Sequence, residues 1–211
     1  MKKKEPRKRE EADRQQTMET RSKILSAATK LFLSKDYHTT TTQEVAKLAG
    51  VSKGTVFNHF KTKDELVYET LIFVIDKEMA PLFETIPTLP PEIAIRELVN
   101  WTFEVSKDTS GVMWLMLQLA VEGIQKEPSE ISKRLNEKLI GLLEESINQA
   151  APLFESLGFP DPRSASQLFF ALLDGIGGHL FIFKDTRTDE EIERVKDLII
   201  QLFTKGGKFN E

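Results

Sequence analysis

The sequence of 211 residues contains no cysteine and only three histidines. Without cysteine, disulfides and thiolate metal sites are excluded. The histidines, His38, His59 and His179, lie far apart, and none shares a helix face with a carboxylate at ligand-like spacing, so we expect no metal site. There is no nucleophile–base pair and no glycine-rich phosphate loop after a strand. We therefore expect neither an enzyme nor a cofactor-binding protein.

Long apolar runs are also missing from the chain. No run is long enough to span a bilayer, and the charged N-terminus lacks the apolar segment of a signal peptide. A soluble, cytoplasmic protein with no membrane partner is therefore expected. Strand-like alternation and internal repeats are absent too, whereas apolar residues recur at helical spacing, which predicts an all-α fold of about nine helices.

Charge is distributed unevenly along the chain, although the net charge is only −4. Residues 1–66 hold 15 Lys and Arg against 9 Asp and Glu, whereas residues 67–211 hold 14 against 24. A basic head on an acidic body is expected if only the head contacts nucleic-acid phosphates.

Two short helices joined by a tight turn are predicted between residues 41 and 63. Thr41 and Glu44 have the spacing of a capping box, which opens the first helix. Gly50 would end that helix, because glycine adopts a positive φ at little cost. Ser52 can cap a second helix, whose residue Val56 points inward. This arrangement is typical of a helix-turn-helix that places its second helix in the DNA major groove.

From about Thr20 to Leu71 the chain resembles the DNA-binding domain of tetracycline-repressor (TetR) family regulators. The resemblance lies in the pattern T-x-x-E-V-A-x-x-A-G-V-S-x-G-T-V-F-x-H-F-x-x-K-x-x-L. It implies DNA contacts from Thr42, Gln43, Lys53, Gly54, Thr55, Phe57, His59 and Lys63. The family usually has tyrosine where this chain has Phe57, so a hydroxyl contact to phosphate is lost here.

Gly54 and His59 each have a structural interpretation beside the functional one. Glycine within a helix costs about 1 kcal/mol relative to alanine, so a purely structural helix gains nothing from Gly54. A helix pressed against DNA does gain, because the missing side chain allows close approach. His59 can donate to phosphate or can cap the end of its helix, and both roles are compatible.

Three segments are expected along the chain. Residues 1–16 are predicted to be a disordered basic tail, which either only solubilises the protein or contacts DNA. Residues 17–80 form the helix-turn-helix domain, including a helix that opens at a Thr62–Glu65 capping box. Residues 81–211 form a helical effector-binding and dimerisation domain, and the boundary near residue 80 falls in a proline-punctuated loop. An apolar helix around 112–125 is expected to be buried.

Large apolar side chains in the body suggest a site for a small apolar effector, such as a fatty acyl or aromatic compound. The alternative is ordinary core packing. Asp174 could orient a ligand or bond across the helix bundle, and a buried carboxylate there would need a partner. The candidate pocket residues are Trp101, Met113, Trp114, Leu117, Phe170 and Asp174.

Three glycines, at positions 175, 177 and 178, suggest a close helix–helix contact in the eighth helix. The resemblance implies a homodimer in which helices eight and nine of two chains form a four-helix interface. It further implies a repressor that an effector releases from a near-palindromic operator in double-stranded DNA. The alternatives are an activator or a ligand-independent regulator of the same fold, or a helical interaction module or enzyme.

Overall fold

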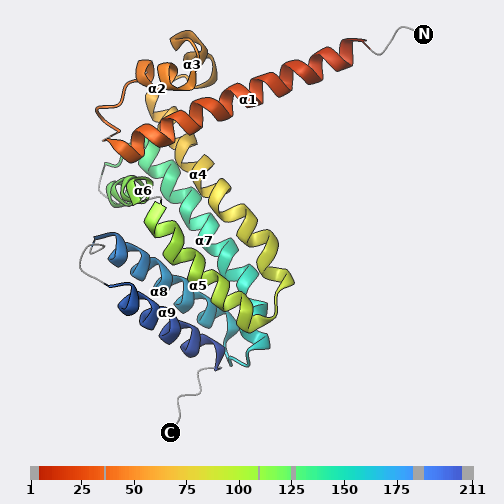
Figure 1. The fold of residues 1–211 in the computed structure, drawn as a ribbon, viewed down its shortest axis with the longest axis vertical. Coiled ribbons are helices and arrows are strands. Elements are labelled where there is room, and N and C mark those ends of the chain that lie inside the picture. Colours follow the sequence, from red (N-terminus) through yellow and green to blue (C-terminus); the bar gives the residue numbers. More distant parts are fainter. Residues whose placement is uncertain (1–4, 36, 109, 125–126, 183–187, 206–211) are drawn as a thin grey trace.

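The computed structural model describes residues 5–35, 37–108, 110–124, 127–182 and 188–205, and all nine α-helices and one 3₁₀ helix assigned below lie in these ranges (Figure 1). The predicted all-α fold is confirmed for these described residues. The helices are α1 (Glu5–Ser34), α2 (Thr42–Ala49), α3 (Lys53–His59), α4 (Lys63–Thr85), η1 (Ile86–Thr88), α5 (Pro91–Asp108), α6 (Ser110–Gly123), α7 (Glu130–Ser156), α8 (Pro162–Ile182) and α9 (Asp189–Thr204).

The head consists of α1, α2, α3 and the first half of α4, packed around one apolar core. Ile24 of α1, Val45 of α2, Val56 of α3 and Leu66 of α4 are each at most 1% exposed. Complete burial of one such side chain stabilises a fold by about 1.5–3 kcal/mol. The helical spacing of the apolar residues therefore fixes which face of each short helix points inward and which remains outside.

The core of the head continues into the body of the molecule. Leu115 and Leu119 of α6, with Ile131 and Leu135 of α7, belong to the same buried cluster as the head residues. Head and body are therefore packed together as one unit at this junction. A displacement of α6 or α7 would be transmitted directly to the helices of the head, because packed side chains leave little free space.

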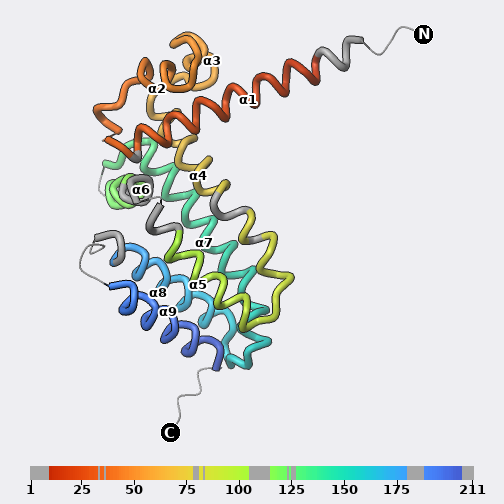
Figure 2. Tube along the Cα trace, in the orientation of Figure 1, coloured from red at the N-terminus to blue at the C-terminus, as the bar shows by residue number. Residues whose placement is uncertain are grey.

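A second apolar core holds α5, α7, α8 and α9 together. It is rich in phenylalanine: the ring centroids of Phe169 and Phe203 are 4.9 Å apart, and that of Phe154 lies 5.5 Å and 5.9 Å from them. The rings meet at steep angles, the arrangement that aromatic pairs prefer. Figure 2 shows α8 and α9 side by side at the edge of the body remote from α4.

Two predictions about segment boundaries are wrong. The tail predicted to be disordered over residues 1–16 is helical from Glu5, and residues 1–4 lie outside the described part. Adding residues to an existing helix is easier than starting a new one. The polar N-terminal residues of α1 can therefore extend the helix from its C-terminal half, which is anchored by packing in the core. Pro81 lies inside α4 rather than in a loop, and the helix crosses the proposed boundary near residue 80.

Two smaller expectations also need correction. At α4 the cap Thr62 accepts from the Glu65 N–H at 3.0 Å, but the Glu65 carboxylate accepts from the Lys61 N–H at 2.6 Å, so the predicted capping box is only half formed. The helix predicted to be buried, α6, is buried on one face only within its described side chains. Leu115 and Leu119 are in the core, whereas Val121 is 51% exposed. The exposed face shows that an apolar run does not by itself establish burial.

Candidate nucleic-acid interface

The first helix of the motif, α2, is held at its start by a complete capping box. The Glu44 N–H donates to Thr41 Oγ1 at 3.3 Å, and the Thr41 N–H donates to the Glu44 carboxylate at 2.8 Å. Lys35 Nζ lies 2.6 Å from the same carboxylate. The Lys35 hydrogen bond, followed by the Thr41 N–H, lowers the pKa of Glu44 to about 2. The ionised form that the cap requires is therefore maintained over the whole neutral range.

The turn between α2 and α3 depends on Gly50. The φ angle of this residue is 68°, in the left-handed region of backbone conformation. A residue with a side chain would lose free energy of folding by adopting that conformation, whereas glycine adopts it readily. The next residue, Val51, donates its N–H to Ala46 O at 3.0 Å, which satisfies a carbonyl at the end of α2. Ser52 then caps α3 by accepting from the Thr55 N–H at 3.0 Å. These local bonds confirm the predicted helix-turn-helix and set the direction of α3.

The outer face of α3 carries the residues that the sequence pattern selected. Lys53 and Gly54 are exposed, Phe57 is 42% exposed and Thr55 is half-buried, whereas Val56 points into the core. Lys53 Nζ lies 5.7 Å from the centroid of the Phe57 ring, within the range of a cation–π contact. A basic group and an aromatic ring therefore lie together on the exposed side of the helix.

Gly54 is not required by any contact within the chain. A Cβ atom at this position would meet only Ser52 Oγ, at 3.6 Å, which is an ordinary van der Waals distance. The backbone of α3 is therefore open to close approach from outside at this residue.

The remaining predicted contact residues lie around α3. Thr42, the first residue of α2, is half-buried, and Gln43 after it is exposed. His59, the last residue of α3, is half-buried. Lys63 Nζ donates to the carbonyl of His38 at 2.7 Å, so in this state it joins the start of α4 to the α1–α2 loop. The structure thus gives Lys63 a structural partner that the sequence pattern did not indicate.

Arg21 of α1 is a positioning residue that the sequence analysis missed. Its guanidinium lies 2.7 Å from Glu69 of α4 and 5.0 Å from the centroid of the Phe60 ring, directly after α3. It therefore joins α1 to the elements that carry the motif. Glu69 is 48 residues away in the chain, so no local spacing could have indicated this pair.

The residues predicted to line an effector pocket are not all brought together. Trp101 and Phe170 are half-buried in the body, and Phe170 packs against Phe169 with ring centroids 5.7 Å apart. Leu117 is 42% exposed on α6. The side chains of Met113 and Trp114 lie outside the described part of the structure. The pocket stays a prediction.

Asp174, the sixth candidate, lies on the exposed side of α8. Desolvation by the surrounding protein nevertheless raises the pKa of its carboxyl. Solvent still reaches the residue in the single chain, so the desolvation is incomplete. Whether Asp174 orients a ligand or bonds across the helix bundle stays a prediction.

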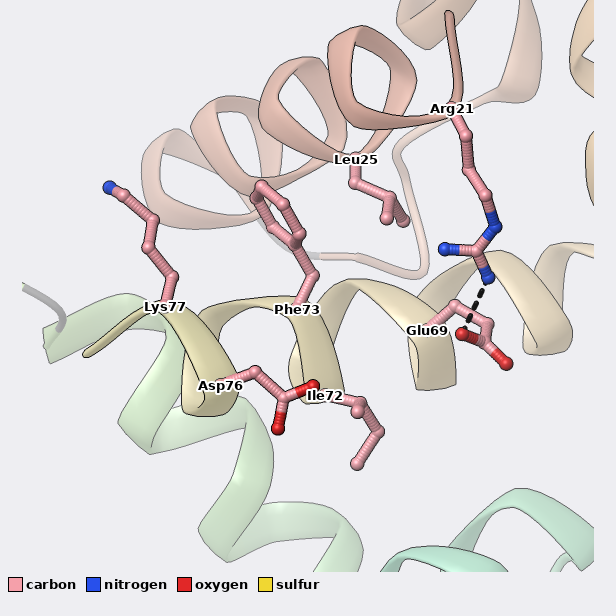
Figure 3. Close-up of a pocket in the computed structure, with 7 residues that line it drawn as sticks. All are labelled: Arg21, Leu25, Glu69, Ile72, Phe73, Asp76 and Lys77. Carbon is pink, nitrogen blue, oxygen red and sulfur yellow. Dashed lines mark hydrogen bonds and ion pairs between the residues drawn. The ribbon is translucent and has the colours of Figure 1, made fainter. Parts of the chain in front are cut away.

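A cleft of about 350 Å³ lies elsewhere, between α1 and α4 (Figure 3). Its lining combines apolar and charged side chains of the two helices, and Figure 3 shows the Arg21–Glu69 pair at one end of it. None of the six candidate effector residues contributes to it. The lining residues are Arg21, Leu25, Glu69, Ile72, Phe73, Asp76 and Lys77.

Other kinds of site are not indicated in the described ranges. No group of three or more histidine or acidic side chains there is placed to hold a metal ion. None of the described helices is long and apolar enough to cross a membrane.

Comparison with known proteins agrees with the geometry of the head. Residues 24–70 match the family described as bacterial regulatory proteins, tetR family. This segment therefore carries a DNA-binding domain of the TetR family. The chain is 36% identical over 85 residues to the HTH-type transcriptional regulator RutR of Escherichia coli K12. The aligned stretch covers 40% of each protein. The chain thus spans about two fifths of the length of such curated relatives.

Solved TetR-like structures extend the similarity of fold to the body. A transcriptional regulator from Rhodococcus sp. Rha1 superposes with a TM-score of 0.72 at 23% identity, over 90% of this chain and 98% of that one. FadR from Bacillus subtilis, solved in complex with stearoyl-CoA, gives a TM-score of 0.65 at 20% identity, over 88% and 98%. At these identities the likeness establishes the architecture of the body and not its ligand.

Proposed function

We propose that this chain is a TetR-family transcriptional repressor that binds a near-palindromic operator as a homodimer and is released by a small apolar effector. The observation that carries the DNA-binding part is the outer face of α3. There an exposed lysine, an exposed aromatic ring and a glycine that no internal contact requires lie on a capped helix. A helix with a polar, uncrowded face suits the major groove.

The dimer is supported by the exposed faces of α8 and α9. A Cβ atom added at Gly175 or Gly178 would meet nothing within 4 Å beyond the adjacent backbone of α8 itself. Glycine weakens a helix by about 0.5–1 kcal/mol relative to alanine, so contact with a second chain would explain both residues. Leu168 of α8 is 64% exposed and Leu198 of α9 is 58% exposed, which leaves apolar surface for that contact. Two heads are needed because one head covers only a half-site.

Release by an effector is supported by the core that the head shares with α6 and α7. Across the same junction, the Arg134 guanidinium of α7 lies 4.1 Å from the centroid of the Tyr68 ring of α4. A ligand that moves α6 or α7 would therefore move α4, and with it the spacing of the two heads. FadR from Bacillus subtilis, which shares this fold, was solved in complex with stearoyl-CoA, a compound that carries a long apolar acyl chain.

The proposal is tested by selecting duplexes from a random pool with the full chain and measuring mobility shifts on the selected site and a scrambled copy. Binding of the selected site as a dimer, at least a thousandfold tighter than the scrambled one, is expected for a specific regulator. Sedimentation of the free protein measures its oligomeric state. A monomer, or equal affinity for both duplexes, would contradict the proposal.

The effector is tested on the same complex with fatty acyl and aromatic compounds, using tryptophan fluorescence to follow binding. Linkage requires operator DNA to weaken the ligand by the factor by which the ligand weakens DNA binding. An apolar compound whose affinity is unchanged by saturating operator is not an inducer.

A further inference from the structure

The cleft between α1 and α4 has the size and the apolar lining of a site for a small organic molecule (Figure 3). Leu25 of α1 is 2% exposed, and Ile72 and Phe73 of α4 are half-buried, so the middle of the cleft is apolar. Its volume of about 350 Å³ lies within the range of ligand pockets. A cavity of roughly 150 Å³ already admits benzene, so one aromatic ring with a polar group at each end fits here.

One end of the cleft carries a guanidinium with unused hydrogen-bond donors. Arg21 donates to Glu69 through one nitrogen, at 2.7 Å, and its side chain is 39% exposed. A guanidinium has five N–H donors. Figure 3 shows that the terminal nitrogen not bonded to Glu69 points along the cleft, towards Leu25 and Phe73. The Glu69 bond and the Phe60 ring, 5.0 Å from the guanidinium, hold this group in place before a ligand arrives.

The other end of the cleft carries a carboxylate. Asp76 is exposed, and it makes no hydrogen bond or ion pair within the described part of the chain. It follows Glu69 by two helical turns, which corresponds to about 10.5 Å along α4 at 1.5 Å per residue. Figure 3 shows the Nζ atom of the neighbouring Lys77 directed away from Asp76. The Asp76 carboxylate can therefore accept a hydrogen bond from a ligand.

We propose that this cleft is a second effector site, which binds a small aromatic carboxylate that carries an amino or hydroxyl group at the opposite end of its ring. The ligand carboxylate accepts hydrogen bonds from the spare donors of Arg21, and the far group donates to Asp76. Between these ends the ring packs against Leu25 and Phe73. Hydrogen bonds between ionised groups are shorter and stronger than neutral ones. Asp76 repels an anion that lacks the far donor, and Arg21 repels a cation that lacks the carboxylate, so the lining selects for both groups.

Occupation of the cleft also affects DNA binding, and this part of the inference rests on the proposed function. Arg21 joins α1 to Glu69 of α4 and to Phe60, the residue directly after α3. A ligand carboxylate on Arg21 competes with Glu69 for the guanidinium, because the two anions repel each other. Weakening of that ion pair loosens the attachment of α1 beside α3, so we expect the ligand to weaken operator binding. By linkage, operator DNA weakens ligand binding by the same factor.

The binding test uses the full chain without DNA and three probes of nearly equal size. They are 4-(aminomethyl)phenylacetate, which carries both polar groups, 4-methylphenylacetate, which lacks the amine, and 4-methylbenzylamine, which lacks the carboxylate. An NMR titration measures each affinity and shows which backbone amides shift. We expect the first probe to shift amides of α1 and α4 around the cleft. It should bind about tenfold tighter than either analogue, the usual worth of one hydrogen bond to a charged group.

A variant of Asp76 and a matched control link the probe to this cleft. Asp76→Asn should weaken 4-(aminomethyl)phenylacetate about tenfold and leave 4-methylphenylacetate no weaker, because only the first probe donates to this carboxylate. Asp76 is exposed, so the replacement should leave folding intact, which thermal unfolding checks. Glu97→Gln removes one carboxylate from the exposed face of α5 and should bind all three probes as wild type does. Equal affinity of wild type and Asp76→Asn for the first probe would overturn the site.

Mobility shifts on the selected operator then test the regulatory role. Saturation with 4-(aminomethyl)phenylacetate should weaken operator binding about fivefold, at the lower end of usual coupling between sites. Operator affinity that is unchanged with the cleft occupied would overturn the effector role. If the wild-type protein binds no duplex, the proposed function fails, whereas the NMR titration still decides whether the cleft binds the probe.

Discussion

The replacement Gly54→Ala should separate the stability of the head from its affinity for DNA. The added methyl group would meet only Ser52 Oγ, at 3.6 Å, so no clash within the chain opposes it. Alanine in place of glycine stabilises a helix by about 0.5–1 kcal/mol. Gly54 is the second residue of α3, where the gain is at the lower end of that range. For a protein of this size we expect Tm to rise by about 1–2 °C.

Operator affinity should change in the opposite direction. The methyl group stands on the outer face of α3, where it would hold the helix backbone away from DNA. A loss of about tenfold, or ~1.4 kcal/mol, is expected for the selected site. The assay is a fluorescence anisotropy titration of the operator duplex, combined with thermal unfolding of the free protein.

Gly141→Ala is the matched control. Gly141 lies exposed in α7, and a Cβ atom there would meet nothing within 4 Å. This variant should gain stability in the same way and should bind the operator as wild type does. The close-approach argument is refuted if Gly54→Ala binds the operator unchanged. A fall in Tm for Gly54→Ala would instead contradict the open surroundings of this residue.

Three further predictions concern the same head. Lys53→Ala should cost ~1–3 kcal/mol mainly on the cognate site, because we expect this exposed lysine to contact a base edge; equal losses on a scrambled duplex would exclude that role. Phe57→Tyr should tighten operator binding by ~0.5–1.5 kcal/mol through one regained phosphate hydrogen bond, and an unchanged Kd would show that the ring faces away from the backbone. Glu44 has its pKa lowered from 4.5 to about 2 on folding, so its contribution to stability is present above pH 4.5 and lost as the pH falls towards 2. Unfolding of Glu44→Gln by urea should therefore show a weaker pH dependence between pH 4.5 and 2, and a dependence equal to wild type would remove this role.

The helix-turn-helix could be predicted from the sequence because its signals are local. The Thr41–Glu44 cap, the turn at Gly50 and the cap at Ser52 each depend on residues within a few positions of one another, and all three are present. The inward face of α3 also follows from spacing alone, since Val56 and Phe60 lie one turn apart and both are buried. Such features need no knowledge of distant segments.

Burial of the helices in the body could not be inferred in the same way. Apolar composition predicted a buried α6, yet its described side chains are buried on one face only. The length of α1 was also missed, because its polar N-terminal half has no apolar pattern and extends from an anchored helix. The predicted effector pocket depends on how four or more helices pack, and none of its candidate residues lines the cleft described between α1 and α4.

The sequence by itself determined the helices of the motif, their caps and the polar face that α3 presents, since these depend on short-range hydrogen bonds and on a 3.6-residue period. Only the tertiary structure decided that Arg21 pairs with Glu69, that Lys63 is bonded to the His38 carbonyl, and that α6 and α7 share the core of the head. Those contacts join residues far apart in the chain, and their partners are selected by the packing of whole helices. Packing is a property of the assembled fold, so no local pattern encodes it.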